Sequence, residues 1–153
     1  IYALSVADQF IKTGMYNNVL VVGAEIHSTA LDISTRGRNT AVIFGDGAGA
    51  VVLQPANSPG ILSTHLHSDG HFAEELYVKD PGSSRPHNER QPDQILDTST
   101  YKVVMNGNQV FKHAVVRFME VINEALRANN LQRTDINLLV PHQSIYSGKT
   151  RAL

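Results

Sequence analysis

The stretch AVIFGDGAGAVVL, residues 41–53, is the most distinctive part of this sequence and indicates its fold class. Apolar runs at 40–44 and 50–53 each predict a strand. Between them lie three glycines and one carboxylate: Gly45, Asp46, Gly47 and Gly49. Because glycine adopts backbone conformations that other residues avoid, this spacing predicts a tight turn between two strands, with the carboxylate bonded to the turn.

The same stretch excludes two nucleotide-binding motifs. A dinucleotide fingerprint, G-x-G-x-x-G, lies between a strand and a helix, whereas here position 50 is alanine and a strand is expected next. A phosphate-binding loop requires Gly-Lys followed by Ser or Thr, and the stretch contains no lysine. The glycines are therefore interpreted as structural.

The segments before this stretch predict an α/β protein. Residues 2–13 place apolar side chains at helical spacing, and Gly14 follows as a helix-terminating residue. The uninterrupted apolar run 19–22 predicts a strand buried on both faces. Helix, short turn and buried strand succeed one another as in an α/β layer.

The segments after it continue the pattern. Residues 61–66 predict another strand, and the proline-containing residues 69–100 predict a long irregular connection. Residues 107–128 form the clearest helix, because their apolar side chains make a wide stripe. Residues 136–140 predict a last strand with His142 at its carboxyl end, where ligands of α/β sheets bind.

Composition narrows the classes of function. The 153 residues are 42% hydrophobic and 18% charged, as in a globular domain with a core. The net charge of −1 argues against binding of the whole domain to nucleic acid or an acidic membrane. The sequence has no cysteine, so disulfides, thiolate zinc sites and a cysteine nucleophile are absent from this chain.

Two groups of residues are of types that could form a binding site for phosphate or for a metal ion. Arg36 and Arg38 stand before a strand, and paired arginines suit phosphate; a solvated loop is the alternative. The stretch HLHSDGH offers His65, His67 and His71 as metal ligands, but its spacing departs from the hydrolase pattern H-x-H-x-D-H. A metal-dependent hydrolase is therefore a minor alternative.

Five stretches together resemble one family, the β-ketoacyl-acyl-carrier-protein synthases of type III, which are condensing enzymes with the thiolase fold. They are YALSVADQFIKTG, RNTAVIFGDGAGAVVL, GILSTHLHSDG, MNGNQVFK and LLVPHQ, and they occur in family order over residues 1–143. The resemblance implies part of a layered αβαβα fold. Residues 1–57 would end its first half and residues 58–143 would begin its second.

The resemblance also implies a reaction. In this family a cysteine takes an acyl group from acyl-CoA, and malonyl-ACP then loses carbon dioxide and attacks the acyl group to give a β-ketoacyl-ACP. That cysteine precedes the segment matching Ile1. The chain is therefore expected to be an internal fragment that is inactive alone and aggregates readily. His142 matches the histidine that stabilises negative charge on the malonyl thioester oxygen.

Further roles follow by motif from the same resemblance. Arg38 matches the arginine at the nucleotide end of CoA, and Lys112 a basic residue that docks the acidic carrier protein. The pantetheine tunnel would be lined by Gly107, Asn108 and Phe111. The implied enzyme is a cytoplasmic homodimer that uses CoA thioesters as substrates, with no cofactor or metal and no nucleic-acid or membrane partner.

The chain departs from the family after Gln143. The family continues A-N-x-R-I, whereas this sequence reads SIYSG. Either this branch of the family differs here or, as we favour, residues 144–153 are an atypical tail that is not native. Two alternatives within the fold stay open. One is a synthase of secondary metabolism with another acyl donor, and the other is a subunit without catalysis.

Overall fold

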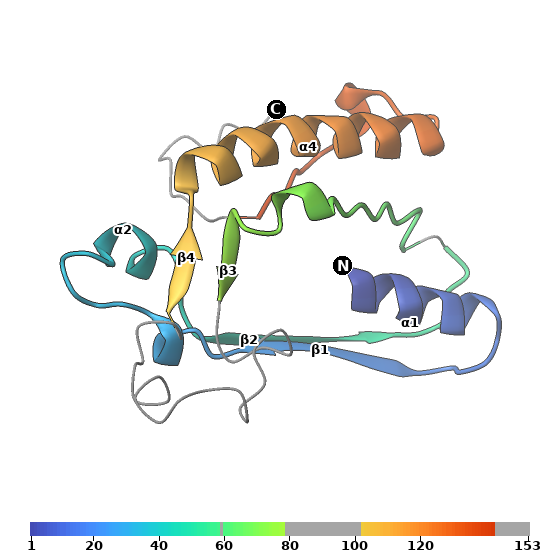
Figure 1. Cartoon of the computed structure of the whole chain (residues 1–153). Coiled ribbons are helices and arrows are strands. Elements are labelled where there is room, and N and C mark those ends of the chain that lie inside the picture. Colours follow the sequence, from blue (N-terminus) through green and yellow to red (C-terminus); the bar gives the residue numbers. More distant parts are fainter. Residues whose placement is uncertain (59, 79–101, 143–153) are drawn as a thin grey trace. The chain divides into compact units, whose positions relative to one another are not determined.

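The computed structural model describes residues 1–58, 60–78 and 102–142 (Figure 1). These group into two compact units, which are described separately. The first unit comprises Ile1–Glu25, Gly47–Ser68 and Val115–Leu153, and the second comprises Ile26–Asp46 and Asp69–Ala114. The expected division into halves at 1–57 and 58–143 concerns a larger fold and stays a prediction. The expected atypical tail, 144–153, lies outside the described residues.

The first unit is built on a two-stranded antiparallel sheet. Strand β1 (Val19–Glu25) pairs with β2 (Gly47–Leu53) over seven residue pairs, from Val19 opposite Leu53 to Glu25 opposite Gly47. Helix α1 (Tyr2–Lys12) contacts both strands (Figure 1). The unit also contains the second part of helix α4 (Gly107–Ala128) and a short 3-10 helix, η5 (Arg133–Asp135).

The second unit contains the other sheet. Strand β3 (Leu76–Val78) pairs antiparallel with β4 (Val103–Met105), which leads directly into α4. Helix α2 (Arg38–Ala41) contacts β4. Two 3-10 helices complete the unit, η1 (Ser28–Ala30) and η2 (Gly70–Phe72).

Helix α1 confirms the prediction for residues 2–13 and ends as expected at Gly14. The Gly14 N–H donates to the carbonyl of Ile11 at 3.0 Å, and the Met15 N–H donates to that of Phe10 at 3.0 Å. This pair of bonds is a Schellman motif, and it requires a left-handed residue at its centre. Gly14 supplies that conformation, with φ of 71°.

Helix α4 confirms the prediction for residues 107–128 at both ends. It ends in the same motif, because the Asn130 N–H donates to the carbonyl of Arg127 at 3.2 Å and the Leu131 N–H to that of Leu126 at 2.9 Å. Here Asn130 takes the left-handed conformation, with φ of 54°. Asparagine is the second choice for this position because its side chain tolerates positive φ.

The glycine-rich stretch is where the prediction was wrong. Residues 40–44 form the end of α2 and a turn instead of a strand, and β2 already begins at Gly47. Gly47 and Gly49 therefore lie inside a strand, opposite Glu25 and Gly23, and do not form a tight turn. Pairing with β1 gives this segment hydrogen-bond partners along the strand, and it outweighs the preference of the glycines for a turn.

Two other predicted strands are also absent from the structure. Residues 61–66 and 136–140 have no regular hydrogen-bonded structure, and Leu138 and Val140 are 77% and 81% exposed. A strand exists only by pairing with a neighbour. Among the described residues the only pairings are β1 with β2 and β3 with β4, so neither segment has a partner.

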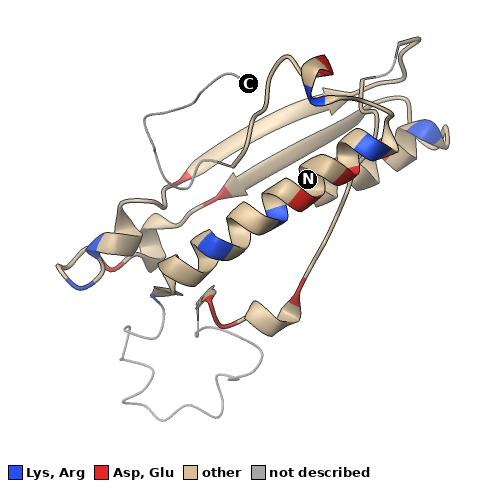
Figure 2. Ribbon diagram, turned by 90° about the horizontal axis from the view of Figure 1, so that it is seen from above, with Lys and Arg blue, Asp and Glu red and all other residues tan. Residues whose placement is uncertain are grey.

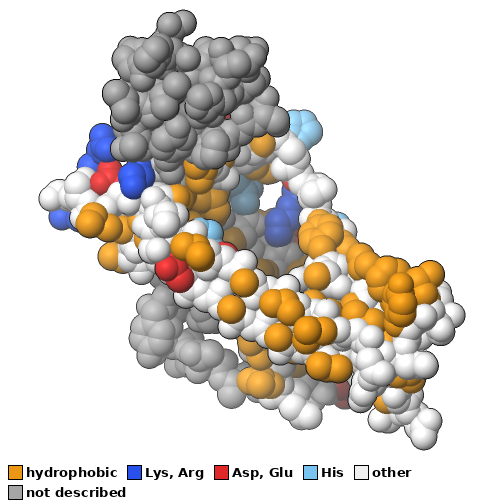
Figure 3. Space-filling model, turned by 90° about the horizontal axis from the view of Figure 1, so that it is seen from below, with side chains coloured by type: hydrophobic (Ala, Val, Ile, Leu, Met, Phe, Trp, Pro, Cys, Tyr) orange, Lys and Arg blue, Asp and Glu red, His pale blue; other side chains and the backbone are white. Residues whose placement is uncertain are grey.

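Strand β1 is confirmed, but its predicted burial on both faces is wrong. Leu20 is 65% exposed and Val22 is 58% exposed. In the described part of the chain, Ala7 of α1 is the only buried hydrophobic residue. Apolar side chains consequently lie at the surface (Figure 3).

The expected irregular connection at 69–100 is only partly described. Its first residues form η2 and β3, and neither was predicted, while residues 79–101 lie outside the described residues. No helix in the described part of the chain is both long and apolar enough to cross a membrane. Basic and acidic residues are interspersed along the described part of the ribbon (Figure 2).

Candidate catalytic and substrate-binding residues

The start of α4 is positioned by hydrogen bonds on both sides of Asn106. The Asn106 N–H donates to the carbonyl of Glu75 at 2.8 Å. Its carbonyl accepts from the N–H groups of Gln109 and Val110, each at 3.0 Å. These bonds connect the first turn of α4 to the segment that precedes β3, so the beginning of the helix is held at one place in the second unit.

The first two turns of α4 present three candidate residues on one face. Asn108, Phe111 and Lys112 are spaced three and four residues apart, so their side chains are neighbours on the helix. All three are exposed, and Phe111 is 55% exposed. Gly107 stands at the helix start, where an added Cβ would lie 3.4 Å from the Met105 side chain.

The two arginines considered for phosphate binding differ in their surroundings. Arg36 bonds through Nε and a terminal nitrogen to the Asp32 carboxylate, each at 2.9 Å. Hydrogen bonds from Ser34 and then from Arg36 lower the pKa of Asp32 to about 2. Arg38, on the neighbouring helix α2, is exposed and forms no ion pair within the described residues. Arg38 is therefore the arginine with a guanidinium available to a ligand.

Asp46 has a structural role, although not the one expected. Its carboxylate accepts from the Ser28 N–H at 2.8 Å and from the Ser28 hydroxyl at 2.7 Å. These bonds lower the pKa of Asp46. Nearby, the rings of His27 and Phe44 lie 5.3 Å apart. Asp46 thus holds η1 against the segment before β2, instead of bonding its own turn.

His142 lies in the first unit, exposed, at the end of the irregular segment that follows η5. It is not at the tip of a strand, because residues 136–140 form none. The other five candidate residues for substrate or carrier binding lie in the second unit: Arg38, Gly107, Asn108, Phe111 and Lys112. Within that unit, the contact of α2 with β4 links the element of Arg38 to the strand that leads into α4.

The histidines considered as metal ligands are divided between the units. His71 bonds to Asp69 at 2.9 Å in the second unit. In the first unit His65 and His67 share the carboxylate of Glu124, at 3.1 and 2.6 Å. Within the described residues, no three His, Cys, Asp or Glu side chains are arranged to hold a metal ion. The sequence patterns did not indicate Glu124, which is 57 positions from His67.

Comparison with known proteins shows which family the chain is similar to. A family model described as 3-oxoacyl-[acyl-carrier-protein (ACP)] synthase III matches residues 1–70. A beta-ketoacyl-[acyl-carrier-protein] synthase III of Yersinia pestis (strain Pestoides F) is 48% identical over 143 residues, covering 94% of this chain and 41% of the relative. Over 94% of its length the chain is similar to this family. The synthase III of Methylococcus capsulatus is 44% identical over 144 residues with the same coverage.

Solved structures of synthase III enzymes support the same fold. That of Thermus thermophilus has a TM-score of 0.77 and 38% identity, and covers 94% of this chain and 42% of that one. The priming beta-ketosynthase of the R1128 polyketide pathway has a TM-score of 0.75 and 31% identity, and covers 94% and 40%. The chain is thus part of a thiolase-like α/β fold and spans about two fifths of the length of its synthase III relatives.

Proposed function

We propose that this chain contributes to the decarboxylative Claisen condensation that starts fatty acid synthesis, in which an acyl-CoA and malonyl-ACP give a β-ketoacyl-ACP. The observation that supports this most is the 48% identity, over 94% of the chain, to a beta-ketoacyl-ACP synthase III. The sequence contains no cysteine, so a thiolate nucleophile would come from outside this chain.

His142 is the proposed catalytic residue. Loss of carbon dioxide from the malonyl group places negative charge on its thioester oxygen, and a donor held at that oxygen stabilises the transition state. The imidazole N–H of His142 would supply one such bond. The carbanion then attacks the acyl carbonyl, and the thiolate leaves as the new carbon–carbon bond forms.

The second unit would bind the CoA and pantetheine arms of the substrates. Arg38 offers to a phosphate a guanidinium that pairs with no described carboxylate, and Asn108 and Phe111 offer an amide and an apolar ring on one face of α4. Gly107 leaves room for the close approach of a chain at the helix start. Lys112, one position from Phe111, would meet the acidic carrier protein. A cytoplasmic homodimer without cofactor completes the proposal, and it rests on the family resemblance alone.

The condensation is tested in a chimera. Residues 1–142 replace the matched segment of the Yersinia pestis relative, and formation of β-ketoacyl-ACP from acetyl-CoA and malonyl-ACP is measured. The chimera should be active, and His142→Ala should lower its rate by roughly a hundred-fold or more, as loss of one oxyanion donor does. A folded chimera without activity, or with the same activity after His142→Ala, would contradict the proposal.

The binding role of Arg38 is tested on the chain itself. Isothermal titration with acetyl-CoA should show binding that Arg38→Ala weakens by about tenfold or more, because a bond to a charged group is worth about 1.5–3 kcal/mol. Arg36→Ala is the matched control, since Arg36 already pairs with Asp32. Equal losses of affinity in the two variants would show that the effect comes from removal of a positive charge and not from a specific contact of Arg38.

A second candidate function is priming of a polyketide chain with another acyl donor. It is favoured by the likeness to the R1128 priming beta-ketosynthase. A panel of acyl-CoAs of increasing length and branching, used with the same chimera, separates the two. Preference for acetyl-CoA supports fatty acid initiation, and preference for a longer or branched donor supports the alternative.

A further inference from the structure

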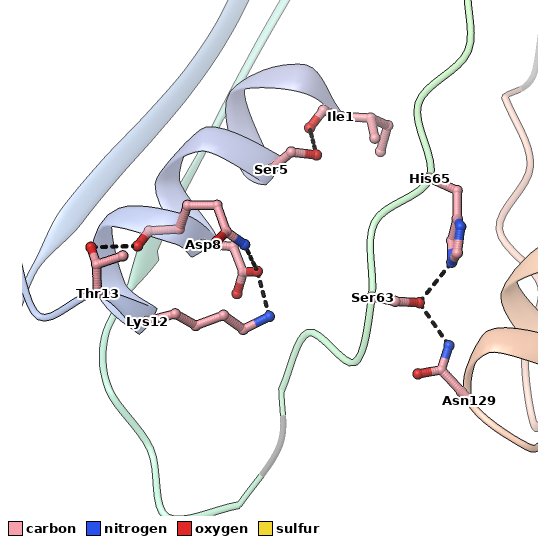
Figure 4. Close-up of polar contacts among 9 residues, drawn as sticks. Ile1, Ser5, Asp8, Lys12, Thr13, Ser63, His65 and Asn129 are labelled. Atoms are coloured by element: carbon pink, nitrogen blue, oxygen red, sulfur yellow. Dashed lines mark hydrogen bonds and ion pairs between the residues drawn. The ribbon is translucent and has the colours of Figure 1, made fainter.

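Four side chains of the first unit form a continuous line of polar contacts, and Figure 4 shows three of these side chains, Ser63, His65 and Asn129. Asn129 Nδ2 lies 2.7 Å from Ser63 Oγ, and Ser63 Oγ lies 2.8 Å from His65 Nε2. On the other side of the ring, His65 Nδ1 lies 3.1 Å from Glu124 Oε1. A hydroxyl, an imidazole and a carboxylate thus follow one another, with one ring nitrogen facing each neighbour.

One assignment of the protons in this line gives Ser63 and His65 the roles of nucleophile and base. The amide nitrogen of Asn129 is only a donor, and it donates to Ser63 Oγ and to the carbonyl of Ala125 at 2.8 Å. In this assignment the hydroxyl proton of Ser63 is directed to His65 Nε2, which is then unprotonated and accepts it. His65 then carries its proton on Nδ1 and donates it to Glu124.

The carboxylate of Glu124 is held ionised and in place. His67 Nε2 bonds to its second oxygen at 2.6 Å, and bonds from His67 and then from His65 lower the pKa of Glu124. The side chain of His65 is only 15% exposed, so little water competes for its ring nitrogens. The orientation of the ring is consequently set on both sides.

Ser63 and Asn129 also line an apolar cavity of about 400 Å³. Its walls come mainly from α4 and the residues after it, among them Met119, Ile122, Leu126 and Leu131. Cavities of this size and composition hold small ligands with long apolar parts. Because Ser63 belongs to the lining, an acyl chain bound against these walls would lie beside this residue.

We propose that Ser63, His65 and Glu124 form a second catalytic site, a Ser-His-Glu triad that hydrolyses esters of apolar acyl chains bound in this cavity. Such triads are recognised by geometry and by the role of each group, not by their order in the sequence. Ser63 is the nucleophile, His65 is the general base and Glu124 holds the imidazole in the required tautomer. This site shares no residue with the one proposed for condensation.

The reaction balances with water as the second substrate. Ser63 Oγ bonds to the ester carbonyl carbon while its proton passes to His65 Nε2, and the alcohol then leaves with that proton. Water attacks the acyl group on Ser63 and gives a proton to Nε2, which returns it to Ser63 Oγ as the carboxylic acid departs.

The test uses the complete 153-residue chain and a fluorophosphonate, which reacts with activated serines. Mass spectrometry of the labelled chain should show one phosphonyl group on Ser63. Because this result is read on the unaltered chain, it does not depend on how a variant folds. Labelling of another residue, or of none, would overturn the proposal.

Hydrolysis of p-nitrophenyl esters provides the second readout. The rate should rise with acyl length from acetyl to octanoyl, and Ser63→Ala and His65→Gln should each lower it about a hundred-fold or more. Ser5→Ala is the matched control, because Ser5 Oγ donates to the carbonyl of Ile1 at 3.2 Å and forms no hydrogen bond with a described histidine (Figure 4). Hydrolysis that Ser63→Ala leaves unchanged would refute the site.

Discussion

The two Schellman motifs of the first unit allow a matched prediction about stability. Gly14 closes α1 with φ of 71°, and Asn130 closes α4 with φ of 54°. An alanine at position 14 must adopt the same left-handed conformation, because the bonds from Gly14 and Met15 to the helix depend on it. We expect Gly14→Ala to destabilise the first unit and Asn130→Gly to leave it unchanged or slightly stabilised.

The magnitude follows from backbone conformation alone. No atom lies within 4 Å of a Cβ built on Gly14, so the substitution creates no steric overlap. The left-handed region costs a residue with a Cβ roughly 1–2 kcal/mol, and the lower entropy of unfolded alanine offsets about 0.4–1 kcal/mol of this. The net loss for Gly14→Ala is about 1 kcal/mol, roughly a five-fold change in the unfolding constant.

Urea unfolding followed by far-ultraviolet circular dichroism measures this difference. Both positions lie in the first unit, so the two variants report on the same transition. The midpoint should fall for Gly14→Ala with an unchanged slope, and it should not fall for Asn130→Gly. If Gly14→Ala were as stable as the original chain, the left-handed cap would not be what ends α1.

Two further predictions concern the second unit. A Cβ on Gly37 would overlap with the carbonyl oxygen of Asp32, so Gly37→Ala should lower the midpoint of thermal unfolding. Gly45→Ala is the control and should not lower it, because a Cβ on Gly45 would have no neighbour within 4 Å. Equal midpoints for the two variants would contradict this prediction. Asp46 has its pKa lowered from 3.8 by Ser28, so its stabilisation is complete above that value and is lost as the pH falls through the lower pKa of the folded state. Asp46→Asn should flatten that acid limb of a stability–pH profile, and an unaltered limb would show that the Ser28 bonds do not stabilise the unit.

The parts of the fold that were predictable are those determined by neighbouring residues. The bounds of α1 and α4 follow from apolar spacing and from Gly14 and Asn130, which act within one turn of the chain. The strands were less predictable because a strand needs a partner far away in the sequence. Residues 61–66 have the composition of a strand, yet no described segment pairs with them.

The same distinction applies to the candidate sites. Motifs identified the family and selected Arg38, His142 and the start of α4, because each motif is a short run of residues. Periodicity could not show that Asp46 would bond to Ser28, 18 positions away, instead of its own turn. Contacts between distant segments depend on how elements pack, which local pattern does not specify.

The Ser63 site shows why such contacts matter for function. Ser63 and His65 lie two positions apart in a stretch whose histidines, considered alone, suggested a metal site. Glu124 lies in α4 and Asn129 directly follows this helix, and Asn129 is 66 positions from Ser63. A triad requires the carboxylate to face Nδ1 of the histidine while the hydroxyl faces Nε2. Glu124 near the end of α4 meets the first requirement, so Ser63 and His65 become a candidate nucleophile and base. If α4 ended one turn earlier, Asn129 would lose its bond to the Ala125 carbonyl. Its amide would then no longer be held in position to donate to Ser63 Oγ.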